Sequence, residues 1–230
     1  MKANLPNTDH RLPGRRAVLL SAVCAAAWPA TCPKAATLPV PPSGTLAFRL
    51  IRHGGEIGRH TLTFEHDGDT LTVHTAVDAS VTLISIPIVR YRHRVVETWR
   101  GDTLTSLASE TDKNSQHEWM NAHRVAEGLV VLGSKTERYV APEPAGATSY
   151  WNRRVLDGPM ISLEDGVLLR PKVEVLHAET VPLASGATIQ ADHYNLSGPF
   201  RVDLWYDRSA TWAGLALDAA DGSTVHYERL

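Results

Sequence analysis

Repeated hairpin patterning limits the fold of this chain more than any other sequence feature. Apolar and polar residues alternate through residues 46–51, 59–64 and 71–77, and Asp67-Gly68-Asp69 separates the last two segments. Alternation with a period of two residues is typical of a strand that buries one face. Because Asp-Gly sequences favour tight turns between such strands, we expect antiparallel hairpins in this region.

The same pattern continues to the C-terminus. Further strand-like segments cover residues 91–99, 103–109, 116–125, 129–133, 161–163, 167–175, 191–197, 200–206, 212–218 and 224–229. Consecutive hairpins form an antiparallel meander, and a twisted sheet of this many strands curls. We therefore predict an all-β fold, a curved antiparallel meander that is either a half-barrel or an open barrel.

Residues 147–157 interrupt this pattern, because their apolar residues have helical rather than strand spacing. These apolar residues are Tyr150, Trp151, Val155 and Leu156. Thr148 or Ser149 could cap such a helix, since hydroxyl side chains accept hydrogen bonds from the first free backbone N–H groups. We expect one short helix here that covers an open end of the curved sheet.

The first 36 residues have the pattern of an export signal. A basic stretch that ends in Arg15-Arg16 precedes an apolar run over residues 17–27. This run is shorter than the roughly 20 residues that a membrane-spanning helix needs. Small residues permit cleavage before Trp28 or nearer Ala36. We therefore predict a periplasmic or secreted protein.

The export route is left open by the residues around the arginine pair. Arg15 and Arg16 favour the twin-arginine route. However, Gly14 and Val18 stand where that signal usually has Ser or Thr and Phe, so general secretory export is the alternative.

The expected organisation is a leader over residues 1–36, a Pro-rich linker over residues 37–43 and a single β-rich domain over residues 44–230. Both cysteines, Cys24 and Cys32, fall in the leader. The remaining domain would therefore contain no disulfide, thiolate nucleophile or cysteine metal ligand.

Charge argues against nucleic acid as a partner. The leader contains five Lys or Arg residues and one Asp, so 18 of the 23 basic residues and 24 of the 25 acidic residues lie in the rest of the chain. An acidic domain without a basic cluster is a poor binder of nucleic acid or of anionic membrane surfaces.

Aromatic residues supply the main candidates for a ligand site. Ser149, Tyr150, Trp151 and Asn152 could line the mouth of a cavity, because Trp and Tyr combine apolar faces with a polar atom. A capped helix packed into the core explains the same residues, so both interpretations stay open. The other candidate wall residues are Trp99, Trp119 and Trp205.

The strand around His93 has two distinct faces. Arg90, Arg92 and Arg94 share one face, whereas His93 and Glu97 lie on the other, mostly apolar face. His93 is a candidate ligand-binding residue near the cavity mouth, or else a hydrogen-bonded core histidine. The arginines could recognise a carboxylate or phosphate, or form a solvated face.

Metal and catalytic motifs give no positive signal. His117 and His123 would lie about 20 Å apart on one strand, and Asp192 and His193 could contribute to a zinc site only together with residues of other strands. No serine lies in a Gly-x-Ser-x-Gly elbow. We therefore predict no metal, no cofactor and no catalytic residue.

Several motifs resemble an exported bacterial family catalogued as domain of unknown function 6134. They are Tyr91-Arg92-His93, Thr148-Ser149-Tyr150-Trp151-Asn152, Leu204-Trp205-Tyr206-Asp207, Trp212-Ala213-Gly214-Leu215 and Asp221-Gly222-Ser223-Thr224-Val225-His226-Tyr227. The resemblance covers nearly all of the predicted domain and implies secretion and a β-rich fold. That family has no assigned activity, so no residue roles carry over.

The layout is also similar to that of exported lipoprotein-carrier-like proteins. In those proteins a curved antiparallel sheet wraps an apolar cavity that a helix closes. This second resemblance concerns architecture, and architecture does not fix function.

Together these observations favour a binding protein over an enzyme. We predict an exported envelope protein that binds a lipid or another small apolar or amphipathic molecule in the concave face of its sheet. One alternative is a structural or interaction domain with an envelope protein partner, and another is a His-dependent enzyme. An open cavity inside the sheet would favour ligand binding, whereas a filled interior would favour interaction; the sequence does not indicate an oligomeric state.

Overall fold

The computed structural model describes residues 38–83, 86–219 and 221–230. The predicted leader, its arginine pair and its cleavage sites lie outside the described residues. The described residues all belong to one compact unit. Among the described residues, no helix combines the length and the apolar character that crossing a membrane requires.

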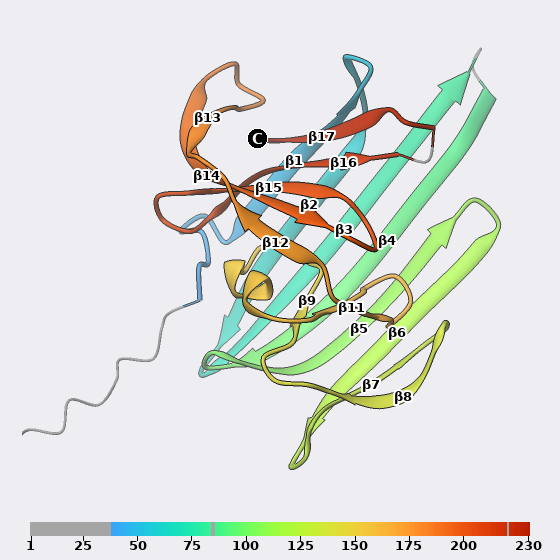
Figure 1. Ribbon diagram of the computed structural model, residues 1–230, viewed down its shortest axis with the longest axis vertical. Coiled ribbons are helices and arrows are strands. Elements are labelled where there is room, and N and C mark those ends of the chain that lie inside the picture. Colours follow the sequence, from blue (N-terminus) through green and yellow to red (C-terminus); the bar gives the residue numbers. More distant parts are fainter. Residues whose placement is uncertain (1–37, 84–85, 220) are drawn as a thin grey trace, which may run out of the picture. The chain divides into compact units, whose positions relative to one another are not determined.

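One large antiparallel sheet contains most of the chain (Figure 1). Its first half consists of β1 (Thr45–Arg52), β2 (Gly55–Asp67), β3 (Thr70–Leu83), β4 (Ile86–Arg100), β5 (Thr103–Lys113), β6 (Gln116–Val125), β7 (Gly128–Gly133) and β8 (Thr136–Ala141). Its second half consists of β12 (Lys172–Val175), β13 (Glu179–Pro182), β14 (Thr188–Ser197), β15 (Val202–Asp207), β16 (Trp212–Asp218) and β17 (Thr224–Arg229).

The strand order confirms the predicted antiparallel meander. It runs β12-β14-β15-β16-β17-β1-β2-β3-β4-β5-β6-β7-β8, and β13 pairs with β14. Within the described chain, the two ends of this order do not pair with each other, so the sheet is open rather than a closed barrel. The last strand joins the first, because Phe48 of β1 lies opposite Arg229 of β17.

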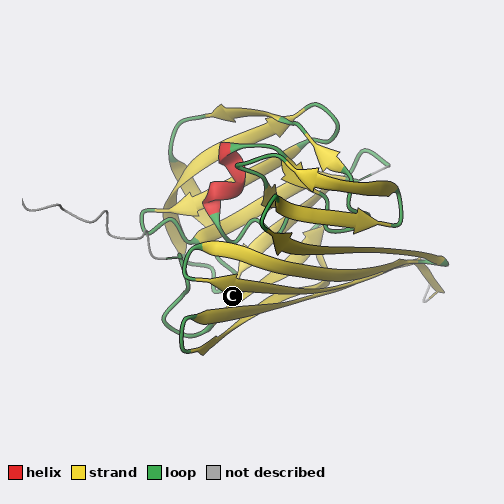
Figure 2. Ribbon diagram, turned by 90° about the horizontal axis from the view of Figure 1, so that it is seen from below, coloured by secondary structure: helices red, strands yellow, loops and turns green. Residues whose placement is uncertain are grey.

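Residues 142–170, which we call the insert, lie outside this sheet. They contain β9 (Gly146–Ala147), the 3-10 helix η1 (Arg153–Asp157), β10 (Met160–Ile161) and β11 (Leu168–Leu169), and the three short strands form a second sheet. Figure 2 shows η1 between strands on either side. A Cβ at Gly158 would overlap the carbonyl oxygen of Pro144, so this glycine lets the insert fold tightly on itself.

The helix begins later than the sequence predicts. Asn152, and not Thr148 or Ser149, is its N-cap, and its side chain accepts a hydrogen bond from the backbone N–H of Arg154 at 3.2 Å. The two hydroxyl residues have other partners: Thr148 Oγ1 accepts from the Leu163 N–H at 3.1 Å, and Ser149 bonds to Glu97.

The insert fills much of the concave face. Trp151, Val155 and Met160 pack in one hydrophobic cluster with residues of β1–β3 and β14–β16. Ile161 and Leu163 pack in a second cluster with residues of β4–β8. Over this region the interior of the sheet is therefore occupied by protein side chains, which is the outcome that favours an interaction role, and space for a ligand is left only at the margin of the insert.

Candidate ligand-binding site

A buried carboxylate joins the insert to the main sheet. Glu97 of β4 is 0 % exposed. It accepts hydrogen bonds from Trp99 Nε1 at 3.0 Å and from Trp151 Nε1 at 3.1 Å, and it also bonds to the Ser149 side chain. Burial raises the pKa of this carboxyl, and the hydrogen bonds from the three side chains oppose that shift. Two of the three donors belong to the insert, so Glu97 fixes the insert on β4.

Edge-to-face aromatic contacts reinforce this joint. The Trp151 ring meets the Trp99 ring at 5.5 Å and 79° and the Phe64 ring at 5.2 Å and 77°, measured between centroids and ring planes. Such arrangements place the positive edge of one ring against the negative face of another. Trp151 is 1 % exposed, so it packs the insert against the sheet and has almost no accessible surface.

A pocket of about 360 Å³ lies directly beside this joint. We call it the insert pocket, because the insert forms one wall while the β4–β5 hairpin and the end of β6 form the other. Its apolar lining residues are Trp99, Leu104, Pro144, Ala145, Ala147 and Val155. Its polar and charged lining residues are Asp102, Thr103, Arg124, Glu143, Ser149, Asn152 and Arg154. The arrangement combines an apolar wall with hydrogen-bonding groups, as ligand sites usually do.

Two ion pairs contribute charged groups to the insert pocket. Arg124 Nη1 donates to Glu143 Oε1 at 2.7 Å, and Arg124 Nε donates to the carbonyl oxygen of Leu104 at 2.8 Å. Arg154 Nη1 lies 3.2 Å from Asp102 Oδ2. Each pair connects the insert to the main sheet, so the two guanidinium groups stand where the two walls meet.

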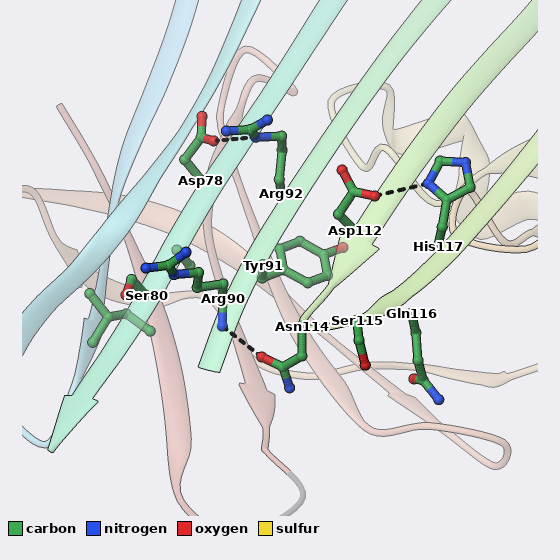
Figure 3. A pocket seen from close by; sticks show the side chains of 12 residues that line it. Asp78, Ser80, Arg90, Tyr91, Arg92, Asp112, Asn114, Ser115, Gln116 and His117 are labelled. Atoms are coloured by element: carbon green, nitrogen blue, oxygen red, sulfur yellow. Dashed lines mark hydrogen bonds and ion pairs between the residues drawn. The ribbon is translucent and has the colours of Figure 1, made fainter. Parts of the chain in front are cut away.

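A second, larger depression of about 540 Å³ lies over β3–β6 (Figure 3). Many of its lining side chains are charged or polar, and four of them form a row across neighbouring strands. This outer row consists of Asp78, Arg92, Asp112 and His117. Arg92 Nε lies 3.6 Å from Asp78, and His117 Nδ1 lies 2.9 Å from Asp112. Because hydrogen-bonded or oppositely charged side chains that face each other across strands stabilise a sheet, these side chains have a structural explanation.

The opposite face of the same strands carries a buried inner row. Its register positions are His60, Val77, His93, Thr111 and Glu118. His93 Nδ1 lies 2.7 Å from Thr111 Oγ1. Burial, together with the Arg94 charge, lowers the pKa of His93 to about 4. His93 is therefore a neutral, hydrogen-bonded core histidine at pH 7 and does not line either pocket.

His60 differs from His93 in having no hydrogen-bond partner. Among the described residues, neither of its ring nitrogens has a partner, and the same holds for the nearby Thr75 hydroxyl. The ring is 7 % exposed and is surrounded by Phe48, Trp212 and Tyr227 at centroid distances of 5.2 to 6.1 Å. Burial lowers the pKa of His60 to about 3.

The insert pocket brings together three of the predicted ligand residues: Trp99, Ser149 and Asn152. Tyr150 does not line the insert pocket. Its carbonyl oxygen accepts from the Tyr206 hydroxyl at 2.7 Å, and its backbone has a φ of +60°. Such a φ is uncommon for a residue with a side chain. Tyr150 thus connects the insert to β15.

Trp119 and Trp205 are not part of the insert pocket. Trp119 lies on the face of β6 opposite the buried Met120, and Trp205 lies on the face of β15 opposite the buried Leu204. Trp205 instead stacks on His193 at 4.6 Å. The alternation of side chains along a strand puts these two residues on the outer face, which excludes them as walls of a concave cavity.

Sequence reasoning missed the charged residues of the insert pocket. Arg124, Glu143, Asp102 and Arg154 come from four separate segments, and nothing in their sequence spacing indicates that they meet. Glu97 did leave a signal, because a carboxyl on a mostly apolar strand face needs buried donors. The sequence could not indicate which side chains supply them.

Within the described part of the chain, no group of three or more His, Cys, Asp and Glu residues has an arrangement suited to a metal ion. His193 lies between two carboxylates: its Nδ1 is 3.0 Å from Glu179 and its Nε2 is 2.9 Å from Asp203. These contacts account for both of its ring nitrogens and fasten β13 to β14 and β15.

Comparisons with known proteins agree with this architecture. A family model described as "Domain of unknown function (DUF6134)" matches residues 48–230. No curated protein matches the chain. A crystal structure of a beta-barrel-like protein of domain of unknown function DUF1849 from Brucella abortus is similar, with a TM-score of 0.57 and 11 % sequence identity over 81 % of this chain and 94 % of that one. At this identity, the likeness concerns the fold alone.

Proposed function

We propose a function from the site itself, because the chain belongs to a family that is described only as a domain of unknown function, DUF6134. The protein binds a small amphipathic molecule in the insert pocket, between the β4–β5 hairpin, the end of β6 and the insert. This proposal places the ligand at the margin of the concave face, because the insert occupies the interior beside it.

The observation that carries the proposal is the composition of the lining of the insert pocket. Trp99, Leu104 and Val155 offer apolar surface inside a pocket of about 360 Å³, while Ser149 and Asn152 offer polar atoms in the same pocket. Ligand sites commonly have volumes of roughly 300 to 1,000 Å³ and combine an apolar lining with a few polar groups that orient the ligand. A small molecule with one apolar and one polar part fits such a lining.

The rigidity of the site also supports ligand binding. Trp99 and Ser149 both bond to the buried Glu97, so two lining residues are held by one carboxylate. Asn152 is held as the N-cap of η1. A site whose side chains are already fixed loses less conformational entropy when a ligand binds.

We propose further that the protein works outside the cytoplasm. The basic and apolar pattern of residues 1–36 supports export. A ligand with an apolar part would then come from the cell envelope or the surrounding medium, with the twin-arginine and general secretory routes both compatible.

Docking of another envelope protein is a second candidate function. Val175 and Leu176, at the end of the edge strand β12, are exposed apolar residues. An edge strand offers unpaired backbone groups to a partner strand. This candidate predicts a stable complex and no bound small molecule.

Native mass spectrometry tests the proposed ligand. The protein would be purified from its native cell envelope, and any bound molecule would then be extracted into organic solvent and identified. Thr103→Trp would fill the insert pocket from its exposed side. Thr188→Trp, at an exposed strand position away from the pocket, is the matched control.

We expect a small molecule to accompany the unmodified protein and the Thr188→Trp variant, and to be lost from Thr103→Trp. If all three proteins have the mass of the bare chain, or if Thr103→Trp keeps the molecule, the insert pocket is not a ligand site.

A further inference from the structure

Arg124 is the best-fixed cation of the insert pocket. Its Nε donates to the Leu104 carbonyl oxygen at 2.8 Å, which sets the plane of the guanidinium, and its Nη1 donates to Glu143 at 2.7 Å. The Arg124 side chain is 28 % exposed, whereas that of Glu143 is 63 % exposed. The Arg124 guanidinium is therefore held by the sheet, whereas its partner, the Glu143 carboxylate, is largely exposed to solvent.

This imbalance makes Glu143 a replaceable partner. An ion pair with an exposed carboxylate contributes little stability, because water screens it and the free side chain keeps its rotamer freedom. A partly buried guanidinium still favours an oxyanion partner, and its planar fork of donors suits a carboxylate or phosphate. A ligand oxyanion could take the place of Glu143 without disturbing Leu104.

The apolar wall lies in the same pocket as this cation. Leu104 both accepts the Arg124 hydrogen bond through its backbone and lines the pocket, together with Trp99 and Val155. The whole domain is acidic, so general attraction of anions cannot direct a ligand here. The local pairing of a fixed guanidinium with an apolar wall is what distinguishes this pocket.

We infer that the ligand is an amphipathic anion, a single short aliphatic chain with a carboxylate or phosphate head group that binds Arg124. This inference rests on the proposed function, since it names the ligand class of the same pocket. A pocket of about 360 Å³ lies near the lower end of ligand-site volumes, which favours one short chain over a two-chain lipid.

Calorimetric titration with three probes of equal chain length tests the inference: octanoate, octan-1-ol and octylammonium. Charge-assisted hydrogen bonds to a guanidinium contribute about 1.5 to 3 kcal/mol, which corresponds to about tenfold or more in affinity. We therefore expect octanoate to bind at least about tenfold more tightly than octan-1-ol and octylammonium to bind most weakly. Octyl phosphate, titrated in parallel, distinguishes a preference for phosphate from one for carboxylate.

Two variants and one control isolate Arg124. Arg124→Gln should weaken octanoate binding about tenfold and leave octan-1-ol binding unchanged. Glu143→Gln keeps Arg124 and removes the competing carboxylate, so octanoate should bind more tightly. Arg138→Gln removes the same charge from an exposed position of β8 and should have no effect.

The outcomes separate the inference from the proposed function. Loss of binding of both octanoate and octan-1-ol in Thr103→Trp would show that the insert pocket is the binding site. If octan-1-ol then binds the unmodified protein as tightly as octanoate does, or if Arg124→Gln keeps the preference for octanoate, the assignment of an anion at Arg124 is wrong. If Glu143→Gln fails to tighten octanoate binding, Glu143 is not the displaced partner. If none of the probes binds the unmodified protein, the proposed function fails together with the inference.

Discussion

Glu97 and His60 are both titratable side chains buried inside the same sheet, yet their surroundings differ. Glu97 is surrounded by donors, two of them indole N–H groups of Trp99 and Trp151. His60 is surrounded by the rings of Phe48, Trp212 and Tyr227, and within the described chain neither of its nitrogens has a partner.

The difference shows two ways in which a buried polar group affects a fold. A carboxylate whose donors come from another segment fixes that segment, so Glu97 determines where the insert lies. A histidine without partners loses its contacts with water and gains no hydrogen bond in return. The hydrogen bonds of Glu97 thus determine the position of the insert, whereas the burial of His60 makes the stability of the fold depend on pH.

The largest expected loss of stability comes from removing the hydrogen-bonded carboxyl of Glu97. Glu97→Ala leaves the donors of Trp99, Trp151 and Ser149 buried without an acceptor, and each such group costs about 1 to 3 kcal/mol. We therefore expect the free energy of unfolding in urea to fall by about 4 kcal/mol. Glu110→Ala, at an exposed position of β5, is the control and should change it by less than about 0.5 kcal/mol. Equal effects of the two substitutions would contradict the role of Glu97.

Acidification should act most strongly on the His60 region. The pKa of His60 is about 3 in the folded protein and 6.5 in the unfolded chain, so between these pH values the unfolded chain binds more protons. Stability must then fall as the pH falls. From pH 7 to pH 4.5 the loss due to His60 should be about 3 kcal/mol, because about two pH units of this range lie below the unfolded pKa of 6.5 and each of them contributes about 1.4 kcal/mol.

Comparison with His60→Phe isolates this contribution. Both proteins keep His93, whose lowered pKa adds a loss of the same sign, and Glu97, whose raised pKa acts in the opposite direction. Unfolding free energies measured at pH 7 and pH 4.5 should therefore differ less in the variant, by about 3 kcal/mol. An unchanged pH dependence would mean that His60 does not stay neutral in the fold.

A smaller effect is expected from a single donor of Glu97. Ser149→Ala removes one hydrogen bond and leaves the two indole donors, so the free energy of unfolding should fall by about 1 kcal/mol. Because Ser149 also lines the insert pocket, ligand binding should weaken in the same variant. Ser115→Ala, on an exposed turn, provides the control, and a loss of stability as large as that of Glu97→Ala would show that the carboxylate depends on Ser149 alone.

Much of the fold could be predicted from the sequence because hairpins are local. Alternation and turn residues specify each strand and its neighbour, as for residues 71–77 within β3 and 224–229 at β17. The pairing of β17 with β1 could not be predicted in this way, since it joins segments at opposite ends of the domain and no turn connects them. The helix start was wrong by a few residues because Thr148 and Ser149 have tertiary partners.

The candidate site was predicted only in part, for a related reason. Trp99, Ser149 and Asn152 carried visible signals as an aromatic residue and as polar residues near a helix. Arg124 and Glu143 meet only in the folded chain. Trp119 and Trp205 were assigned to a cavity wall by residue type, but the two-residue period of their strands places them on the outer face.

The smallest expected change in stability, that of His60→Phe at pH 7, tests most directly whether His60 differs from Glu97 in having no hydrogen-bond partner. His60→Phe replaces a ring that has two polar nitrogens by one that has none, in a space bounded by Phe48, Trp212 and Tyr227. Buried polar atoms without partners cost free energy, whereas an aromatic ring here gains edge-to-face contacts. At pH 7 the free energy of unfolding should therefore rise by about 1 kcal/mol, while His66→Phe at an exposed position should leave it nearly unchanged. A loss of stability in His60→Phe would show that the His60 nitrogens have partners, such as buried water. The polar atoms of His60 would then be hydrogen-bonded, as those of Glu97 are.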